Sequence, residues 1–336
     1  MKIIVTGGAG FIGSHTVVEL AQNGYHPIII DDLRNSQSFI IENINKILGH
    51  KIPYYSIDFG DVKKLTDVFK IESPDGIIHF AADKAVNESI INPVKYYQNN
   101  IANLISLLKV VANFKLRSFV FSSSCTVYGK PNTIAVNEKA EIKEANSPYG
   151  YTKQAGERIL NDFFKTKPET AIAHLRYFNP IGAHPSGLIG ELPIGIPSNL
   201  VPFITQTAIG KRDYLTVHGN NYDTLDGTCV RDFIHVVDLA RAHVLTLNHG
   251  INNPENLILN VGTGNGSSVM EVINSFISSN DVALNYKIGP RREGDVPAIY
   301  ADNSLITDKI NWKAEYSLED SLKHAWEWEK KLADNS

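Results

Sequence analysis

Two tyrosines and a lysine stand close together in the segment SPYGYTK. Ser147 is a favoured N-cap residue and Pro148 is favoured at the first helical position, so the segment predicts the start of a helix. Residues four apart lie on one face of a helix, which puts Tyr149 beside Lys153. Tyr151 is only two residues from the lysine and is turned away. We therefore take Tyr149 as the candidate acid–base group.

A glycine-rich loop opens the chain with the segment VTGGAGFIGSH, which places Gly7, Gly10 and Gly13 between a predicted strand and a predicted helix. Such glycines permit a tight turn and the close approach of a pyrophosphate to the helix N-terminus. A tight turn alone is the alternative. Asp31 ends the next predicted strand, 18 residues beyond Gly13, where a carboxylate accepts hydrogen bonds from an adenosine ribose and repels a 2′-phosphate. The segment predicts NAD, and the nearby Arg34 leaves NADP open.

The chemistry of a tyrosine base depends on its pKa, which is about 10 and must fall by about 3 units for work near neutral pH. The Lys153 ammonium, the positive end of the helix and a bound nicotinamide cation each favour the phenolate. Ser124 adds a hydroxyl at the end of SFVFSSS, a predicted strand. Together the three side chains can move a proton from a substrate hydroxyl while hydride leaves its carbon. An exposed tyrosine–lysine pair without chemistry is the alternative for those two residues alone.

Short runs rich in β-branched residues alternate with stretches of helical length through the first half of the chain. This alternation predicts an α/β fold with a doubly wound, mostly parallel, Rossmann-type sheet. The predicted strands cover 2–6, 27–30, 52–58, 76–82, 118–124 and 171–178, and the predicted helices 15–23, 94–113 and 149–165.

The pattern weakens after Phe178, because the segment 179–199 is rich in Gly and Pro and must be irregular. We expect an NAD-binding Rossmann domain of residues 1–180 and a smaller, mixed α/β domain for the substrate in residues 181–336. A strand and a helix are predicted in 233–250, and segments around 233–264 can return to the first domain. A terminal helix is predicted in 317–332.

The composition is that of an ordinary globular protein, with 336 residues, 43% hydrophobic and 20% charged, and a net charge of −4. A slightly acidic chain without a basic cluster argues against nucleic acid as the main partner. Gly7 and Gly8 interrupt the apolar N-terminal run too early for a signal peptide. The sequence contains no run of about 18 apolar residues, so it predicts no membrane span. Cys125 and Cys229 lack metal-site spacing. We expect a reducing, cytoplasmic location, no metal and no disulfide.

The motifs together resemble the extended short-chain dehydrogenase/reductase family, and the likeness to its UDP-hexose 4-epimerase branch runs essentially from end to end. The segments that carry it also include DDLRNS, KAVNES, SSSCTVYG, LRYFNPIGAHPSG, GTCVRDFIHVVDLA and RREGDVPA. Their order and spacing are specific, although each one can be shared with related nucleotide-sugar enzymes. The resemblance implies NAD-dependent 4-epimerisation of UDP-glucose and UDP-galactose. Tyr149, helped by Ser124, would take the proton of the 4-hydroxyl, and transient loss of hydride from C4 would give a 4-keto sugar.

The resemblance also implies a tightly bound NAD that is regenerated in each turnover. Lys153 would bind the nicotinamide ribose and lower the pKa of Tyr149. Asp58 would contact the adenine, and its alternative role is a helix cap. The implied cofactor-binding residues are Gly7, Gly10, Phe11, Ile12, Gly13, Asp31, Asn35, Ser36, Asp58, Phe59, Phe80, Ala81, Ala82, Lys84, Asn99, Tyr149, Lys153 and Phe178.

A second set of residues is implied for the UDP-sugar. Arg231 and Arg292 can hold its diphosphate by forked, charge-assisted hydrogen bonds, and surface salt bridges are the alternative. His218 is expected to stack on the uracil. The full set is Ser124, Tyr149, Asn179, Asn199, Leu200, Thr216, His218, Arg231, Arg292, Asp295 and Ile299.

Position 299 bears on which sugars are accepted. Related enzymes restricted to glucose and galactose usually carry a tyrosine there, whereas relatives that also accept N-acetylated sugars carry a smaller residue. Ile299 is smaller than tyrosine but β-branched. The UDP-glucose/UDP-galactose pair is therefore expected, and UDP-N-acetylglucosamine/UDP-N-acetylgalactosamine, alone or in addition, is the alternative.

Two other classes of protein are less consistent with the sequence. Sugar-nucleotide dehydratases of this family carry an acidic pair after the serine, where this chain has Cys125 and Thr126. A non-catalytic NAD-binding protein needs the glycine loop but not Ser124, Tyr149 and Lys153 together. The resemblance further implies a homodimer formed through the predicted helices 94–113 and 149–165.

Overall fold

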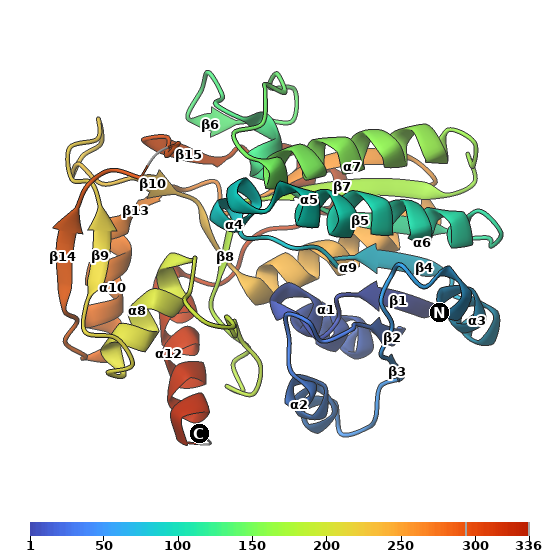
Figure 1. Ribbon diagram of the computed structural model, residues 1–336, viewed down its shortest axis with the longest axis horizontal. Coiled ribbons are helices and arrows are strands. Elements are labelled where there is room, and N and C mark those ends of the chain that lie inside the picture. The colour runs from blue at the N-terminus through green and yellow to red at the C-terminus, as the bar shows by residue number, and fades with distance from the viewer. Residues whose placement is uncertain (293, 335–336) are drawn as a thin grey trace.

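A seven-stranded sheet forms the centre of the structure (Figure 1). The structure is a computed structural model, and it describes residues 1–292 and 294–334. All of the sheet's neighbouring strands run parallel, in the order β12-β7-β5-β4-β1-β2-β3. The strands are β1 (Lys2–Thr6), β2 (His26–Ile30), β3 (Tyr54–Tyr55), β4 (Gly76–His79), β5 (Ser118–Ser124), β7 (Ala171–Tyr177) and β12 (Asn256–Val261). The predicted α/β fold with a doubly wound, Rossmann-type sheet is confirmed.

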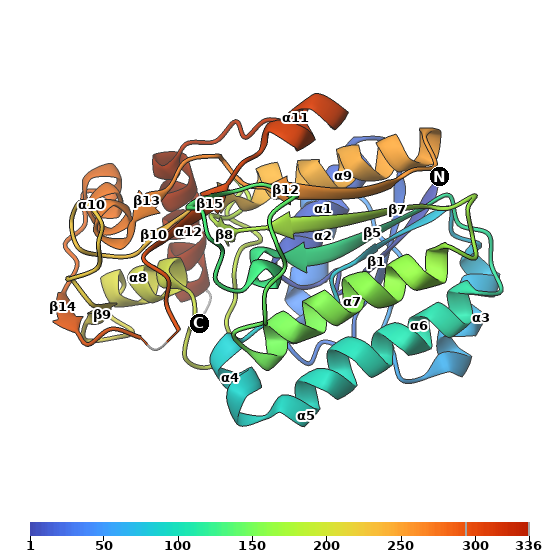
Figure 2. The same cartoon turned by 90° about the horizontal axis from the view of Figure 1, so that it is seen from above.

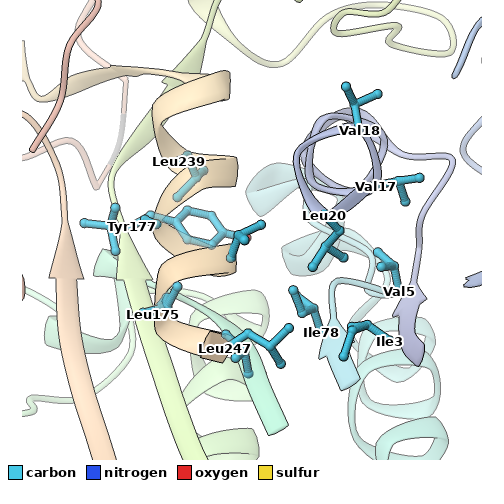
Figure 3. Packing of buried hydrophobic residues seen from close by; sticks show 14 of the residues in the cluster. Ile3, Val5, Val17, Val18, Leu20, Ile78, Leu175, Tyr177, Leu239 and Leu247 are labelled. Carbon is cyan, nitrogen blue, oxygen red and sulfur yellow. The ribbon is translucent and has the colours of Figure 1, made fainter. Parts of the chain in front are cut away.

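Helices cover both faces of this sheet, as Figures 1 and 2 show. The strands are almost continuous apolar runs because both of their faces are buried. Figure 3 shows one of the two layers, where Leu20 and Leu247, from two different helices, lie around Ile78 of β4. One layer contains α1 (Phe11–Gln22), α2 (Ser38–Leu48) and α9 (Val236–Asn252), and the other α3 (Val62–Glu72), α6 (Asn103–Val111) and α7 (Pro148–Phe164).

A smaller unit with its own apolar core lies beyond the carboxyl ends of the large sheet's strands (Figure 1). Its helices are α8 (Leu200–Ala208), α10 (Val269–Asn280) and α12 (Leu318–Asp334), while α11 (Ser304–Ile310) packs against the large sheet's core. Its strands pair as β11 (Phe233–His235) with β8 (Asn179–Ile181), β14 (Tyr286–Gly289) with β9 (Leu215–His218), and β13 (Ser267–Ser268), β10 (Val230–Arg231), β15 (Ala298–Ala301) and β6 (Ala135–Val136) in that order. We propose domains of residues 1–180 and 181–336, with α9 and β12, in the segment around 233–264, returning to the first.

Two of the predicted elements differ most from the observed ones. The strand expected over 52–58 is only Tyr54–Tyr55, because it lies at the sheet edge and follows Pro53, which has no N–H to donate. The helix expected over 94–113 is divided into α5 (Pro93–Tyr96), a π-helical segment η1 (Tyr97–Ala102) and α6, and a short α4 (Val86–Ile91) precedes it. A 3-10 turn η2 (Cys125–Tyr128) follows β5 directly. Among the described residues, no helix combines the length and the apolar character needed to cross a membrane.

Candidate functional site

The first turn of α7 carries Tyr149. The helix begins as the sequence predicts, since the Ser147 hydroxyl accepts a hydrogen bond from the Gly150 N–H at 3.1 Å. Tyr149 is buried, whereas Tyr151 is 52% exposed. The Lys153 ammonium lies 5.8 Å from the centre of the Tyr149 ring. The helix therefore brings Lys153 beside Tyr149 and turns Tyr151 outward.

Three consecutive serines at the carboxyl end of β5 hold this turn in place. The Ser122 carbonyl accepts a hydrogen bond from the Lys153 ammonium at 2.6 Å, and the Ser123 hydroxyl donates to Glu157 at 2.5 Å. The Ser124 hydroxyl accepts from the Thr126 N–H at 3.2 Å and lies close enough to Tyr149 to lower the pKa of its phenol. The predicted serine, tyrosine and lysine thus lie together at the carboxyl end of β5.

Burial dominates the electrostatics of these groups. It raises the pKa of the Tyr149 phenol well above its ordinary value, against a lowering by the nearby Ser124 hydroxyl. Burial also lowers the pKa of Lys153 to about 8, and the Glu157 carboxylate opposes this change. The chain's own groups therefore keep Tyr149 protonated at neutral pH. For Tyr149 to act as a base, further positive charge is needed near its hydroxyl, at the carboxyl ends of the strands.

The glycine loop leaves no room for side chains. Gly7 has φ +67°, and a Cβ added to it would lie 2.9 Å from the Ala81 nitrogen. A Cβ on Gly13 would lie only 2.1 Å from the Gly7 carbonyl oxygen. Gly10 is the N-cap of α1 and provides no side-chain cap, so the first N–H groups of this helix are not capped by that residue. These observations fit the pyrophosphate cradle that the sequence predicts.

Asp31 directly follows β2 and is buried. One of its oxygens accepts from the Ala9 N–H, and the other from the Leu33 N–H and the Ser36 hydroxyl. Burial raises its pKa and these hydrogen bonds lower it. Asp31 therefore ties the glycine loop to the loop after β2, where the sequence predicts the ribose.

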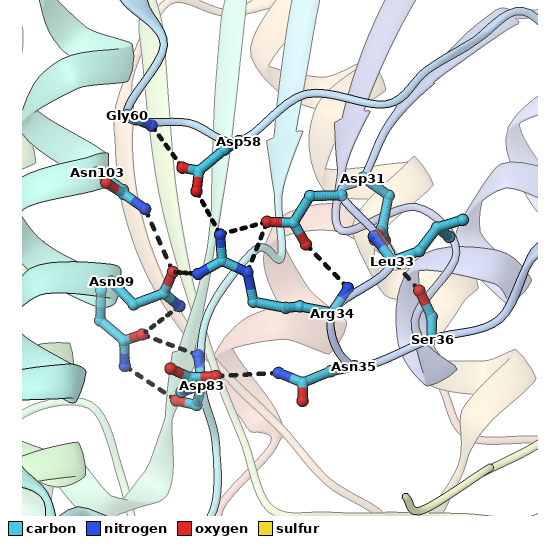
Figure 4. Close-up of polar contacts among 12 residues, drawn as sticks. Asp31, Leu33, Arg34, Asn35, Ser36, Asp58, Gly60, Asp83, Asn99 and Asn103 are labelled. Atoms are coloured by element: carbon cyan, nitrogen blue, oxygen red, sulfur yellow. Dashed lines mark hydrogen bonds and ion pairs between the residues drawn. The ribbon is translucent and has the colours of Figure 1, made fainter.

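A cavity of about 490 Å³ lies next to this loop. Asp58 and Asn99, both predicted to bind the cofactor, line it, and Figure 4 shows Arg34 between them. Asp58 does not cap α3, because its Oδ1 accepts from the Gly60 N–H and the cap is Asp61. The alternative role of Asp58 as a helix cap is therefore wrong.

The other predicted cofactor residues lie near the carboxyl ends of the strands of the large sheet. Asn35 donates to Asp83 at 2.9 Å, and Phe80 follows β4 with its ring 4.7 Å from that of His243. Phe11 and Ile12 begin α1, Phe59 is buried in the core beneath α3 and α6, Ala81, Ala82 and Lys84 follow β4, and Phe178 follows β7.

The predicted substrate residues form two groups. In the first, Ile299 is buried against Phe178 and Cys125, the neighbour of Ser124, and lies opposite Arg231 in the pairing of β10 with β15. Arg231 also forms an ion pair with Asp295 at 3.4 Å. Asn179 begins β8 and Leu200 begins α8, with Asn199 just before it.

The second group lies farther out in the smaller unit. Thr216 and His218 belong to β9, which pairs with β14, and Arg292 is exposed in the loop after β14. His218 is exposed as well. One backbone hydrogen bond, from the Asp295 N–H to the Arg292 carbonyl at 3.4 Å, joins this group to the first.

The sequence reasoning missed two carboxylates near predicted site residues: Glu191, which contacts two of them, and Glu157, which acts on Lys153 by its charge. One oxygen of Glu191 accepts from Lys84 at 2.7 Å and from Asn199 at 2.6 Å, which joins a cofactor residue to a substrate residue. Nothing in the irregular segment 179–199 signals this contact. Glu157 lies one helical turn beyond Lys153, and this spacing of four was a usable signal.

Comparison with known proteins defines the class. Residues 3–262 match the NAD dependent epimerase/dehydratase family, and the chain belongs to this family. It is 46% identical to the UDP-glucose 4-epimerase of Dictyostelium discoideum, over 98% of this chain and 95% of that one. The predicted family membership and the predicted NAD cofactor are confirmed.

Two solved structures cover 100% of both chains. The UDP-glucose-4-epimerase of Stenotrophomonas maltophila, with bound NAD and formylated UDP-arabinopyranose, has a TM-score of 0.97 at 42% identity. The UDP-glucose 4-epimerase of Bifidobacterium longum, in complex with NAD+ and UDP, has a TM-score of 0.96 at 41% identity. The likeness therefore extends over both units of the fold.

Proposed function

We propose that the protein interconverts UDP-glucose and UDP-galactose by NAD-dependent epimerisation at C4 of the hexose. The observation that carries this function is the meeting of Ser124, Tyr149 and Lys153 at the carboxyl end of β5. The full-length likeness to UDP-glucose 4-epimerases supports it. The enzyme is an isomerase of the nucleotide-sugar class.

The three side chains divide the proton transfer between them. Tyr149 takes the proton of the sugar 4-hydroxyl and returns it after the hexose has presented its other face. Ser124 lies beside the phenol and lowers its pKa, and the Lys153 ammonium, 5.8 Å from the centre of the ring, favours the phenolate by its charge. The chemistry that NAD supplies when bound is reversible hydride transfer with C4 of the sugar.

The binding residues follow the two sides of the site. The glycine loop, Asp31 and the residues around Asp58 hold NAD. Arg231 and Arg292 hold the diphosphate of the UDP-sugar. A preference for UDP-glucose and UDP-galactose over the N-acetylated sugar nucleotides is supported by Ile299, which is 7% exposed and packed against Phe178.

Incubation of the purified enzyme with UDP-glucose or UDP-galactose, without added NAD, is expected to give the other sugar nucleotide. UDP-N-acetylglucosamine and UDP-N-acetylgalactosamine are expected to react with a lower kcat/KM, because Ile299 already fills the space beside Phe178. Separation of the products by chromatography measures both pairs. No conversion of UDP-galactose by enzyme that holds NAD would refute the proposed function, and equal kcat/KM values for the two pairs would refute the specificity.

A homodimer is proposed through the outer face of α4, α5, η1, α6 and α7. Apolar side chains from these helices are exposed together there, and the rings of Tyr97 and Tyr151 are in edge contact at 6.1 Å. A continuous exposed apolar face is typical of a protein–protein interface. The exposed residues are Val86, Ile90, Ile91, Val94, Tyr97, Ile105 and Tyr151.

The double variant Ile91→Asp/Val94→Asp is expected to be a monomer, because it places two charges in this apolar face. Light scattering after gel filtration should give about twice the chain mass of 37.2 kDa for the unchanged protein and 37.2 kDa for the variant. Leu225→Asp is the control, since Leu225 is fully exposed in a loop outside this face. A dimer that survives the double substitution would place the interface elsewhere.

The two cysteines bear on the compartment. Cys125 and Cys229 are both free thiols, and no group of residues that could hold a metal occurs in the described part of the chain. Free thiols are typical of a reducing environment, which supports a cytoplasmic location.

A further inference from the structure

Every nitrogen of the Arg34 guanidinium donates a hydrogen bond to another side chain of the protein. Its Nε donates to Asp32 at 2.5 Å, its Nη2 donates to Asp58 at 2.6 Å, and its Nη1 donates to the Asn99 side chain at 2.9 Å (Figure 4). Nη2 also forms an ion pair with Asp32. Three separate segments, the loop after β2, the loop before α3 and η1, thus converge on one cation.

This arginine lies where the adenosine end of the cofactor is expected. It stands three residues after Asp31, in the same loop, and lines the cavity of about 490 Å³ together with Asp58. Its side chain is 40% exposed, so a ligand can reach it. A free arginine at this place would bind a 2′-phosphate by forked hydrogen bonds.

We propose that Asp32 and Asp58 act together with Asp31 in the choice of cofactor, because they occupy Arg34 and withhold it from the 2′-phosphate of NADP. The arginine is present, but its charge is balanced by two carboxylates. The site therefore accepts the uncharged 2′-hydroxyl of NAD and rejects the additional phosphate.

The other charges around the cavity strengthen this preference. Lys95 forms an ion pair with Glu88 at 2.6 Å, and Lys64 forms one with Asp61 at 3.2 Å. Asp31 and Asp83 add two further carboxyl groups nearby, and their hydrogen-bond donors within the described residues are uncharged. The pKa of Lys95 is raised first by its hydrogen bond to Glu88, and the charge of Asp83 raises it as well. Both cations that line the cavity, Arg34 and Lys95, are thus paired with carboxylates. A phosphate dianion would meet net negative charge.

The test is a measurement of which nucleotide the holoenzyme holds. The unchanged protein, Asp32→Asn/Asp58→Asn and Asp32→Asn/Arg34→Ala/Asp58→Asn are incubated with equal concentrations of NAD and NADP until exchange is complete. After gel filtration the protein is denatured, and the released nucleotides are quantified by chromatography. The double variant is expected to raise the bound NADP-to-NAD ratio by about ten-fold or more, the effect of one released charge-assisted hydrogen bond. The triple variant is expected to fall back toward the unchanged protein.

Two outcomes would overturn the proposal. An unchanged ratio in the folded double variant would mean that the carboxylates do not withhold Arg34. An equal rise in the triple variant would mean that lost repulsion, and not the arginine, admits the phosphate. Asp58→Asn alone, at a side chain that is 55% exposed, is the milder variant and should shift the ratio in the same direction. The inference rests on NAD binding only, and no sugar turnover enters the measurement, so failure of the epimerase assignment would leave it intact.

Discussion

Tyr149→Phe is expected to lower kcat for UDP-galactose by about 10²–10⁴-fold, the usual contribution of a positioned acid–base group. The substitution removes only the hydroxyl, and the ring stays buried beside Lys153. The protein should therefore fold and keep its NAD. Steady-state turnover and the NAD content per chain measure the two effects separately.

Tyr151→Phe is the matched control for this experiment. It makes the same chemical change two residues away on the same helix, at a side chain that is 52% exposed. Its kcat should stay within about two-fold of the unchanged enzyme, because the substitution keeps the ring that contacts Tyr97 and removes only an exposed hydroxyl. A Tyr149→Phe enzyme with near-normal turnover would show that another group moves the proton.

Arg176→Met is expected to reduce the free energy of unfolding by about 3–5 kcal/mol, because it leaves one partner of a buried ion pair without the other. Arg176 makes two hydrogen bonds to Glu157, at 2.9 Å and 2.6 Å, and both side chains are buried. Burial would raise the pKa of Glu157, but Arg176 and its other partners hold it below the ordinary 4.5. The pair is thus fully charged at neutral pH, and its stabilisation is lost only as the pH falls below about 4.5 toward the lower folded-state pKa.

Two further variants isolate the pair. Arg176→Met/Glu157→Met should regain most of the lost stability, because an apolar pair in the same space needs no charge partner. Arg158→Met breaks an exposed Arg–Asp pair on the same helix and should change the free energy of unfolding by less than about 1 kcal/mol. Urea unfolding monitored by circular dichroism measures all three. A loss for Arg176→Met no larger than that for Arg158→Met would contradict the expected role of the buried pair.

Local signals in the sequence were sufficient to predict the start of α7 and the side of it that Tyr149 and Lys153 share. Ser147, Pro148 and the spacing of Tyr149 and Lys153 are all contained in one helical turn, and the structure follows them. Six of the seven strands of the large sheet were also predicted, because most of them are apolar runs buried on both faces, whereas β12 was expected only as part of a segment that can return to the first domain. Both depend on residues close together in the chain.

The contacts that join distant segments could not be predicted. Lys84 meets Glu191 across 107 positions, and Arg34 meets Asn99 across 65. No single-chain pattern pairs such residues, since many exposed carboxylates and amides were available as partners. The strand expected over 52–58 was predicted too long for a related reason: the length of β3 is set by its place at the sheet edge, which the sequence does not state.

The first turn of α7 has two sides with different environments. Tyr149 faces β5 and is buried, and Tyr151 faces outward within an exposed apolar surface. A molecule that packed on Tyr151 would restrict the motion of the turn that positions Tyr149. Assembly and ligand binding would then be thermodynamically linked, and each would change the free energy of the other by the same amount. If the molecule on Tyr151 were a second copy of the chain, dilution would separate the two copies. The affinity for the sugar nucleotide would then fall without any change in the residues that contact it.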